Sequence, residues 1–301
     1  MARATSPGGA VFAAALRATV REFVSSRLTY IKGYKVPRVF HAGTHKVEGR
    51  VDYDFKRKVA LVTGAASGIG KAIAQELALS GAQVLVADLD GAGANEVASA
   101  IVKAGGTAKA MQVNVADAVE VELMVQTAKS SFGALHLAVN NAGISGPAAP
   151  TGEYPIDGWH NVINVNLNGV FYGLRYEIPA IMASGGGAIV NMSSILGSVG
   201  FATAPAYVAA KHAVVGLTKV AAMEYAKHGV RINSVGPGFI DTPLVSGHLD
   251  EATLNVIRGM HPIGRLGTSK EVAALTAFLL SDEASFITGS HHLVDGGFVA
   301  Q

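Results

Sequence analysis

Short runs of apolar, often β-branched residues alternate with longer stretches of mixed polarity along most of this chain. The first run is Val59-Ala60-Leu61-Val62, and a glycine-rich turn follows it. The pattern predicts strands at 59–62, 84–87, 109–113, 135–139, 188–192, 231–235 and 292–294. It predicts helices at 71–79, 94–103, 119–132, 159–183, 207–227 and 270–280. Apolar strands that alternate with helices indicate parallel strands buried on both faces, so the predicted fold class is α/β with a doubly wound parallel sheet.

The composition excludes several classes of protein. Half of the 301 residues are hydrophobic and 15% are charged, which is incompatible with a disordered chain. There is no cysteine, so a disulfide framework, a thiolate metal site and a cysteine nucleophile are all excluded. The longest apolar stretches, such as 272–280, are well short of the ~18 residues that span a bilayer, so no membrane partner is expected.

The formal net charge of +2 hides an uneven distribution. Residues 1–50 carry nine basic and two acidic side chains, a net charge of +7, whereas residues 51–301 carry 15 basic and 20 acidic ones, a net charge of −5. Such an asymmetry is typical of a tail joined to a globular body. We therefore predict a basic N-terminal extension at 1–55, disordered or loosely docked, and a single domain at 56–301. The acidic body argues against nucleic acid as a partner.

Two interpretations of the extension stay open. Phe12, Leu16 and Val20 would share one face of a helix, away from Arg17 and Arg21. An acid-poor, Arg-rich amphipathic start resembles an organelle transit peptide, which would place the protein in an organelle matrix. Arg-rich amphipathic stretches are also common by chance, and the favoured interpretation is an extension without a targeting role on a cytoplasmic protein.

The turn after the first strand has the pattern of a dinucleotide-binding, Rossmann-type fold. It reads Thr63-Gly64-Ala65-Ala66-Ser67-Gly68-Ile69-Gly70 and opens a helix, where glycines and free N–H groups can accept a pyrophosphate. Asp88 ends the second strand, 24 residues after Gly64, where a carboxylate can bind a ribose 2′-OH and would repel a 2′-phosphate. Neither Ser67 nor Leu89 offers a cation for that phosphate, so NAD is the predicted cofactor. The alternative for Asp88 is a helix cap.

A tyrosine and a lysine share one face of a later helix. Tyr207 and Lys211 are four residues apart, and a nearby ammonium lowers the pKa of a phenol, which would make Tyr207 a usable acid or base. Such pairs are also common on helix surfaces. Ser194 strengthens the functional interpretation, because it follows the fifth strand at the carboxyl edge where ligands bind in such sheets.

These motifs, in this order, resemble the short-chain dehydrogenase/reductase family. They are TGxxxGxG at 63–70, NNAG at 140–143, Asn166, Ser194, the Tyr207/Lys211 pair and Pro237-Gly238. The resemblance covers residues 56–301 and implies an NAD-binding catalytic domain. A Tyr–Lys spacing of four is that of the common, non-extended branch and not of the divergent enoyl-reductase branch, where the spacing is wider.

The resemblance implies a role for each motif. Tyr207 would be the catalytic acid/base, Lys211 would hold the nicotinamide ribose, and Ser194 would polarise the substrate oxygen. Asn166 would support a water-linked proton relay behind Lys211. The implied cofactor contacts are Gly64, Ser67, Gly68, Ile69, Gly70, Asp88, Leu89, Asn114, Val115, Asn141, Ala142, Gly143, Tyr207, Lys211, Pro237, Gly238, Ile240 and Thr242. Asn114 departs from the Asp that the family often has beside the adenine, but its amide can still accept and donate.

The loops after strands four to six, at 144–154, 195–201 and 243–263, would surround the substrate. They offer few charges, which argues against a phosphorylated substrate. Their apolar side chains are Ile144, Ile195, Leu196, Phe201, Leu244 and Val245. Core or lid packing would explain any single one equally well. As a set they indicate an uncharged, apolar secondary alcohol or ketone, with a cyclic one favoured, and the stretch 173–179 is similar to that of bacterial enzymes acting on cyclic alcohols and diols.

Two alternative functions are kept beside this one. A 3-oxoacyl thioester reductase of the same family would fit NADP, which Asp88 disfavours. A non-catalytic NAD-binding scaffold would have no need of the complete set of Asn166, Ser194, Tyr207 and Lys211.

The resemblance also implies a homo-oligomer, a tetramer or a dimer, with the helices at 159–183 and 207–227 at an interface. No catalytic metal site is predicted, because His291 and His292 would point to opposite faces of a strand. The C-terminal residues 297–301 are similar to those of family members that hold a structural divalent cation near the last residue.

Overall fold

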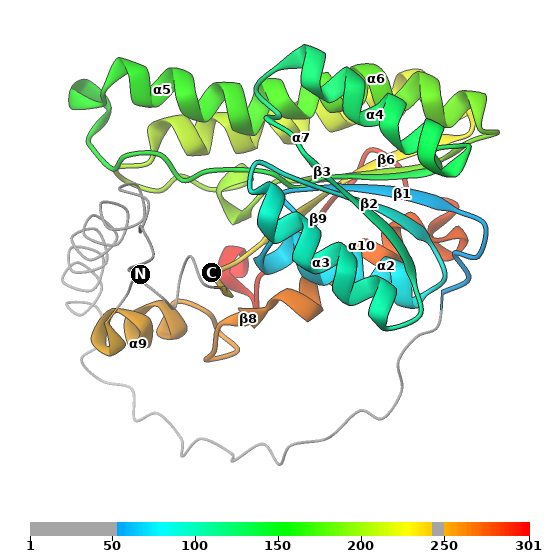
Figure 1. Ribbon diagram of the computed structural model, residues 1–301. Coiled ribbons are helices and arrows are strands. Elements are labelled where there is room, and N and C mark those ends of the chain that lie inside the picture. Colours follow the sequence, from blue (N-terminus) through cyan, green and yellow to red (C-terminus); the bar gives the residue numbers. More distant parts are fainter. Residues whose placement is uncertain (1–52, 243–249) are drawn as a thin grey trace.

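The computed structural model describes residues 53–242 and 250–301. It contains a seven-stranded sheet in the order β3-β2-β1-β4-β5-β6-β9, with every neighbouring pair parallel (Figure 1). The strands are β1 (Val59–Thr63), β2 (Gln83–Asp88), β3 (Thr107–Gln112), β4 (Leu137–Asn140), β5 (Gly187–Met192), β6 (Val230–Pro237) and β9 (His291–Val294). The strand order reverses between β1 and β4, which is where open α/β sheets bind their ligands. The predicted fold class is confirmed.

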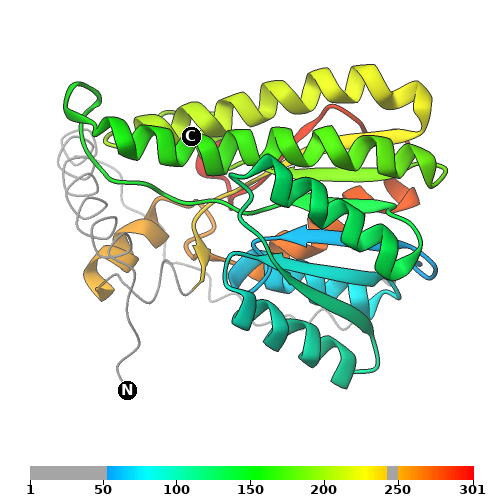
Figure 2. The same cartoon turned by 45° about the horizontal axis from the view of Figure 1, so that its top comes forward.

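Helices cover both faces of the sheet (Figures 1 and 2). One face carries α2 (Gly68–Leu79), α3 (Gly91–Lys103) and α10 (Ser269–Leu280), and the other carries α4 (Ala118–Phe132), α6 (Gly169–Ala183) and α7 (Pro205–Tyr225). Strand β1 shows why the sequence is apolar throughout: Ala60 and Val62 belong to the first core, and Val59 and Leu61 to the second. Successive side chains of a strand point to opposite faces, so a strand between two helical layers needs apolar residues at every position.

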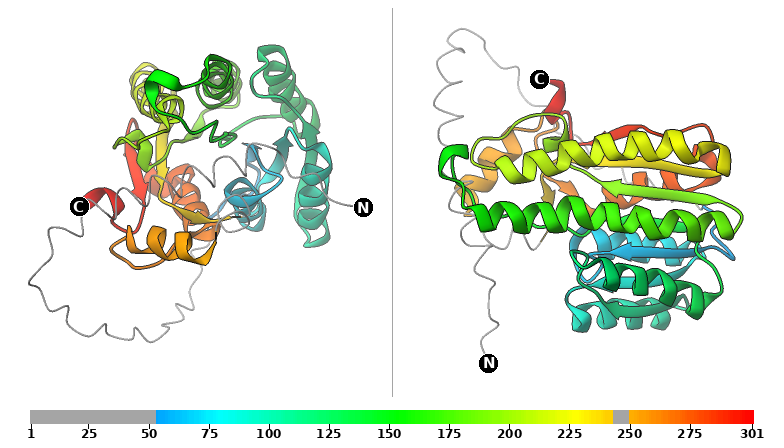
Figure 3. Two further views of the ribbon diagram at one scale, coloured as in Figure 1. Left: turned by 90° about the vertical axis from the view of Figure 1, so that its left-hand side faces the viewer. Right: turned by 90° about the horizontal axis from the view of Figure 1, so that it is seen from above.

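The long helix predicted at 159–183 is interrupted. It begins as α5 (Ile156–Ile163), passes through one π-helical turn at Asn164–Asn168, and continues as α6. Seen from above, α5–α6 and α7 lie side by side over the sheet (Figure 3). The sequence pattern did not predict the π turn, because a single residue inserted into a helix leaves the apolar spacing on either side nearly unchanged.

The region expected to be loop at 243–263 contains a helix in its described part. Asp250 is the N-cap of helix α9 (Glu251–Gly259), and its side chain accepts a hydrogen bond from Thr253 N at 2.8 Å. Two short parallel strands, β7 (Ile240–Asp241) and β8 (Gly267–Thr268), flank it. Helix α9 has nine residues, of which only Thr253, Leu254 and Ile257 are buried, against a small separate cluster. A helix this short and this polar is easily taken for a loop in the sequence.

The N-terminal boundary was predicted at residue 55, and residues 1–52 lie outside the described part of the chain. Phe55 is buried in the first core, and its ring stacks on that of Tyr53 with 6.0 Å between centroids. Its N–H donates to Ser80 O at 2.9 Å. Phe55 therefore belongs to the globular domain and not to the extension. The sequence pattern did not reveal this, because Phe55 precedes the first apolar strand, β1. Within 53–242 and 250–301, no helix has both the length and the apolar character to cross a membrane.

Candidate active site

Two adjoining cavities open at the carboxyl edge of the sheet. The larger, about 430 Å³, lies over the ends of β1, β2 and β4, and the smaller, about 210 Å³, lies over β5, β6 and the start of α7. Both are lined by Ile69, Asn141, Gly143, Ile144 and Thr242. Every residue implied as a cofactor contact lines one of the two cavities. The structure thus brings together a set that is spread over 179 sequence positions, from Gly64 to Thr242.

The glycine-rich turn needs its glycines. Gly64 and Gly68 have φ of +62° and +54°, in the left-handed region that side chains with a Cβ rarely adopt. A Cβ on Gly70 would collide with the carbonyl oxygen of Gly64. Helix α2 starts at Gly68, and the side chain of Ser67 at its N-cap accepts no hydrogen bond from the helix. The first N–H groups of α2 therefore have no side-chain cap there, which suits an anionic group such as a pyrophosphate.

A clamp between β1 and β4 fixes this turn. Thr63 Oγ1 accepts hydrogen bonds from Asn141 N at 2.9 Å and Ala142 N at 3.1 Å. In return Asn141 Nδ2 donates to the carbonyl oxygens of Thr63 and Gly64, at 2.9 and 3.1 Å. Sequence reasoning placed Thr63 and Asn141 in separate motifs, and it did not predict that the two motifs bind each other.

Asp88 stands at the rim of the larger cavity. Its Oδ2 accepts from Ala66 N and its Oδ1 from Asp90 N, both at 2.9 Å. The N-cap of α3 is Asp90, whose side chain accepts from Gly93 N, so the alternative that Asp88 caps this helix is wrong. The Asp88 carboxylate is instead tied to the glycine-rich turn. Leu89, Asn114 and Val115 line the same cavity.

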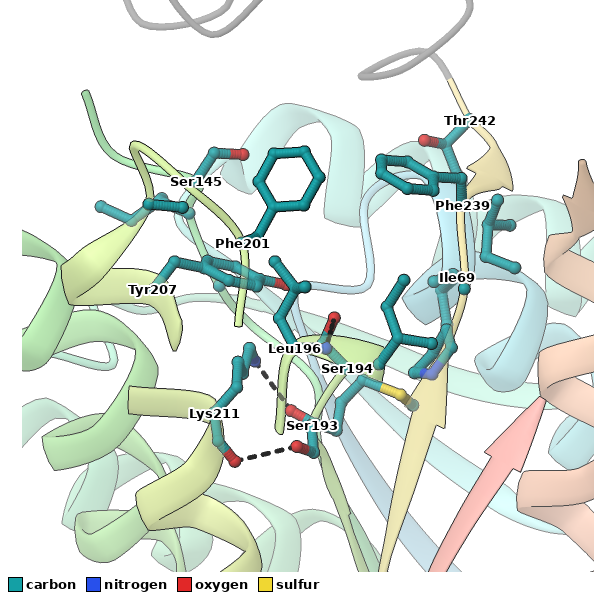
Figure 4. A pocket seen from close by; sticks show the side chains of 18 of the residues that line it. Ile69, Ser145, Ser193, Ser194, Leu196, Phe201, Tyr207, Lys211, Phe239 and Thr242 are labelled. Atoms are coloured by element: carbon teal, nitrogen blue, oxygen red, sulfur yellow. Dashed lines mark hydrogen bonds between the residues drawn. The ribbon is translucent and has the colours of Figure 1, made fainter. Parts of the chain in front are cut away.

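Tyr207, Ser194 and Lys211 meet in the smaller cavity (Figure 4). Tyr207 and Lys211 come from the first turns of α7, and Ser194 follows β5. Lys211 is 3% exposed, its Nζ donates to Met192 O at 2.8 Å, and Nζ lies 5.5 Å from the centroid of the Tyr207 ring. The Ser194 hydroxyl forms a side-chain hydrogen bond with Tyr207. Ser194 and Tyr207 are thus already paired in the cavity that Lys211 also lines.

The pKa values show what burial does to this pair. Burial lowers the pKa of Lys211 to about 8. Burial also raises the pKa of Tyr207 above the usual phenol value, and the hydrogen bond from Ser194 opposes this rise. The direction differs from the lowering expected from Lys211. The reason is physical: a buried ammonium bound to a carbonyl is costly to keep charged, and desolvation of the phenolate outweighs its attraction.

Asn166 lies in the π turn, is completely buried and does not line the smaller cavity. Its Oδ1 accepts from Ile144 N and its Nδ2 donates to Ile144 O, both at 2.8 Å. A Cβ on Gly143 would come within 3.3 Å of Asn166 Oδ1 and 3.6 Å of Lys211 Nζ, so both side chains stand beside this glycine. The extra residue of the π turn lets Asn166 face the NNAG segment. π turns are rare and are often found at functional sites.

Apolar side chains form the rest of the smaller cavity (Figure 4). Ile144, Ile195, Leu196 and Phe201 line it as expected, whereas Leu244 and Val245 lie outside the described residues. The lining also includes Met192, Ser145, Ala204 and Phe239, which the sequence analysis did not name. No sequence pattern identified Phe239, because its neighbours Gly238 and Ile240 line the same cavity and strict alternation would have placed Phe239 on the other side.

The described residues contain no cluster of three or more His, Asp or Glu side chains suited to a metal ion. His291 Nδ1 lies 3.0 Å from Ser234 Oγ, and the side-chain amide of Gln301 donates to Met260 O at 2.7 Å. Gln301 is thus engaged with the segment that follows α9.

A glycine cradle at a helix start and a buried Tyr–Lys pair beside an apolar cavity together define a nicotinamide-dependent oxidoreductase. The family model described as "Enoyl-(Acyl carrier protein) reductase" matches residues 64–299. The chain belongs to the short-chain dehydrogenase/reductase family.

Relatives and solved structures agree with this membership. The chain is 53% identical over 247 residues to a cyclohexanol dehydrogenase of Acinetobacter sp. (strain SE19), covering 82% of this chain and 97% of the relative. It is 45% identical to a cis-4-hydroxycyclohexanecarboxylate dehydrogenase of Sinomonas cyclohexanicum, covering 82% and 98%. A solved structure described as an NAD(P)-dependent gluconate 5-dehydrogenase from Beutenbergia cavernae, with bound NADP at low occupancy, superposes with a TM-score of 0.77 at 35% identity, covering 83% and 100%.

Proposed function

We propose that this protein oxidises an uncharged cyclic secondary alcohol to the ketone with NAD⁺, and catalyses the reverse reduction. The observation that carries the proposal is the Tyr207–Ser194–Lys211 set at the base of an apolar cavity of about 210 Å³ that adjoins the dinucleotide-lined one. In oxidation a C–H and an O–H bond of the alcohol break, a C=O double bond forms, and NADH and one proton leave.

The residues present fit a nicotinamide dinucleotide. The left-handed glycines and the uncapped start of α2 would hold the pyrophosphate, Asp88 the adenosine ribose, and Asn114, Val115 and Ala142 would line the adenosine. Pro237, Gly238, Ile240 and Thr242 line the smaller cavity, where they would hold the nicotinamide amide. When bound, the nicotinamide supplies the hydride chemistry.

The chain's own groups handle the proton. Ser194 Oγ would donate a hydrogen bond to the substrate oxygen and fix its distance to the phenol. Tyr207 Oη would take the hydroxyl proton in oxidation and return it in reduction. Lys211 would hold the nicotinamide ribose and, once its ammonium faces bound ligand groups, stabilise the phenolate. Asn166, beside Lys211 at Gly143, would support the path by which the proton leaves.

Two observations favour NAD over NADP. The carboxylate of Asp88 lines the larger cavity and is held there by two backbone N–H groups. A 2′-phosphate would approach this negative charge, and neither Ser67 nor Leu89 could neutralise it. The NADP in the solved structure described as a gluconate 5-dehydrogenase is bound by that protein and does not bear on the cofactor of this chain. The choice is therefore tested directly, by comparing kcat/KM for the two cofactors with one alcohol.

The substrate class rests on the cavity and the relatives. Most of its walls are aliphatic or aromatic, and the polar residues among them are Asn141, Ser145, Ser193, Ser194, Tyr207, Lys211 and Thr242. A carbocycle with a single hydroxyl fits such walls, in which Lys211 is the one charged side chain. The two relatives above act on cyclohexane rings by their names. We therefore choose cyclohexanol as the first substrate.

The decisive experiment follows NADH absorbance with cyclohexanol, for the native protein and for Tyr207→Phe. The phenyl ring keeps the shape of the cavity and removes only the hydroxyl. Turnover should fall by at least about a thousandfold, in keeping with the loss of a general base. The Kd of NADH, measured by its fluorescence, should change little. Full residual turnover in Tyr207→Phe would refute the assignment, and absence of turnover in the native protein over a panel of alcohols and ketones would refute the proposed activity.

A further inference from the structure

The wall of the smaller cavity opposite Tyr207 contains Phe239 (Figure 4). This residue lies in the connection between β6 and β7, directly after Pro237-Gly238, which line the same cavity. Its ring meets that of Phe201 edge to face, with 6.4 Å between centroids and an interplanar angle of 63°. The position of the Phe239 ring therefore decides how much space a substrate finds beside Phe201.

The backbone of Phe239 is held on both sides by the segment that follows α9. Its N–H donates to His261 Nε2 at 3.2 Å, and its C=O accepts from Gly267 N at 3.0 Å. His261 is 2% exposed, and its Nδ1 lies 2.9 Å from Ile257 O, one helical turn earlier. These partners fix the tautomer: Nδ1 must carry the proton to donate to a carbonyl, and Nε2 must be the acceptor for an N–H.

The imidazole also supports the Phe239 side chain. The two rings are nearly perpendicular, at 86°, with 5.8 Å between centroids. Phe298, near the C-terminus, packs against both, with its centroid 6.0 Å from Phe239 and 5.6 Å from His261. A Cβ at position 238 would stand 2.9 Å from His261 Nε2, so Gly238 is needed for this close approach.

We propose that His261 is a positioning residue for substrate specificity: its Nε2 and its ring hold Phe239 as a fixed wall of the substrate cavity. His261 lies in the third cavity on the other side of Phe239 and does not line the substrate cavity itself, so it acts only through Phe239. This inference rests on the proposed function, because the wall selects among alcohols. A ring-shaped substrate fills the cavity and contacts Phe239, whereas a small acyclic alcohol binds without contacting Phe239.

The first test removes the hydrogen-bond acceptor of the Phe239 N–H, which is His261 Nε2. In His261→Asn the shorter amide can still donate to Ile257 O but leaves no acceptor at the position of Nε2, so the N–H of Phe239 is buried without a partner. In His261→Gln the side-chain oxygen reaches the position of Nε2 and can accept from Phe239 N. The two variants carry the same functional group and differ in its reach. His228→Asn, after α7 at the opposite edge of the sheet, is the control for a histidine substitution elsewhere.

The first readout is the ratio of kcat/KM for cyclohexanol to that for propan-2-ol. A loss of folded protein lowers both values equally and leaves the ratio unchanged. We expect His261→Asn to lower the ratio by about tenfold, mainly through KM for cyclohexanol, since a shift of a wall by a fraction of an ångström has effects of this size. His261→Gln should restore most of it, and His228→Asn should match the native protein. An unchanged ratio in His261→Asn, or equal losses in the Asn and Gln variants, would overturn the proposal.

The second readout needs no substrate. Hydrogen exchange of the peptide spanning residues 237–242, followed by mass spectrometry, reports protection of the Phe239 N–H. Exchange should be faster in His261→Asn and near native in His261→Gln, and unchanged exchange in both would refute the hydrogen bond. If the Asn variant does not fold, Phe298→Leu, which removes the ring behind both residues, should lower the same ratio about threefold, and an unaltered ratio there would count against the proposal. If the native protein turns over neither these two alcohols nor any other alcohol or ketone of the panel, the proposed function fails, while the exchange experiment still decides whether His261 holds Phe239.

Discussion

Glu177 is the one fully buried carboxyl group in the described part of the chain, and replacing it with Gln should change how stability depends on pH. It lies on the inner face of α6 with no exposed surface. Its Oε2 accepts from Asn140 Nδ2 at 2.9 Å, and Asn140 Nδ2 also donates to Asn191 Oδ1 at 3.0 Å. Its Oε1 has no hydrogen-bond partner among the described residues. Burial raises the pKa of Glu177 to about 7, although the hydrogen bond from Asn140 opposes the rise.

The sign of the effect follows from linkage. Between the usual carboxyl pKa near 4.5 and the folded value near 7, the folded chain binds a proton at Glu177 that the unfolded chain has lost. The free energy of unfolding therefore falls as pH rises through this window, and the loss is complete above pH 7. A difference of about 2.5 pKa units corresponds to about 3 kcal/mol at 1.36 kcal/mol per unit.

The assay is urea unfolding of the native protein and of Glu177→Gln at pH 5 and pH 8.5, without cofactor. Gln keeps the shape of the protonated acid, can accept from Asn140 Nδ2 through its oxygen and cannot ionise. At pH 5 the two proteins should differ by no more than about 1 kcal/mol. At pH 8.5 the Gln variant should gain about 2–3 kcal/mol relative to the native protein, or roughly 5–10 °C in Tm for a domain of this size. Glu224→Gln, on the exposed side of α7, is the control and should show no such gain. A difference between native protein and Glu177→Gln that is the same at both pH values would refute the reasoning.

Three further predictions concern the cofactor side of the site and the surface. Thr63→Val keeps the shape of the side chain but leaves the N–H groups of Asn141 and Ala142 without their acceptor. The free energy of unfolding, measured with urea, should fall by about 2–3 kcal/mol, and NADH should bind more weakly in a fluorescence titration. Thr63→Ser should keep the native stability and the native NADH affinity. Asp88→Ala should raise the ratio of kcat/KM for NADP to that for NAD by at least about tenfold, that is ~1.4 kcal/mol, and an unchanged ratio would contradict the role given to its charge. Met223 on α7 is 83% exposed, and if α6 and α7 form a subunit interface, Met223→Glu should shift the mass measured by light scattering toward the monomer without loss of fold.

The sequence predicted the elements that local pattern controls. Strands β1, β2 and β5 begin or end within one residue of the predicted bounds, because each is an apolar run buried on both faces. Helix α9 was not predicted, because it has only nine residues and few of them are apolar, with Leu254 and Ile257 buried against a small cluster. The π turn was not predicted either, since nothing in the spacing of apolar residues separates it from the helix on either side.

The site was predicted as a set of positions, and the contacts between them were not. Motif order placed Tyr207, Ser194 and Lys211 at one edge of the sheet, because all three lie at carboxyl ends of strands or at the helix start that follows. His261 belongs to no motif, and Glu177 lies in the stretch 173–179 without having been given a role there. The importance of both depends on partners 22 and 37 residues away, Phe239 and Asn140. A buried polar side chain must find its partner in three dimensions, so neither periodicity nor composition can reveal it. The direction of the Tyr207 pKa shift has the same origin, since spacing shows how near an ammonium lies but not how deeply both groups are buried. Buried polar residues whose partners lie far along the sequence are therefore the ones for which structure adds most to a motif-based assignment. The His261 variants test one of them through substrate preference, and the Glu177 variant tests another through stability.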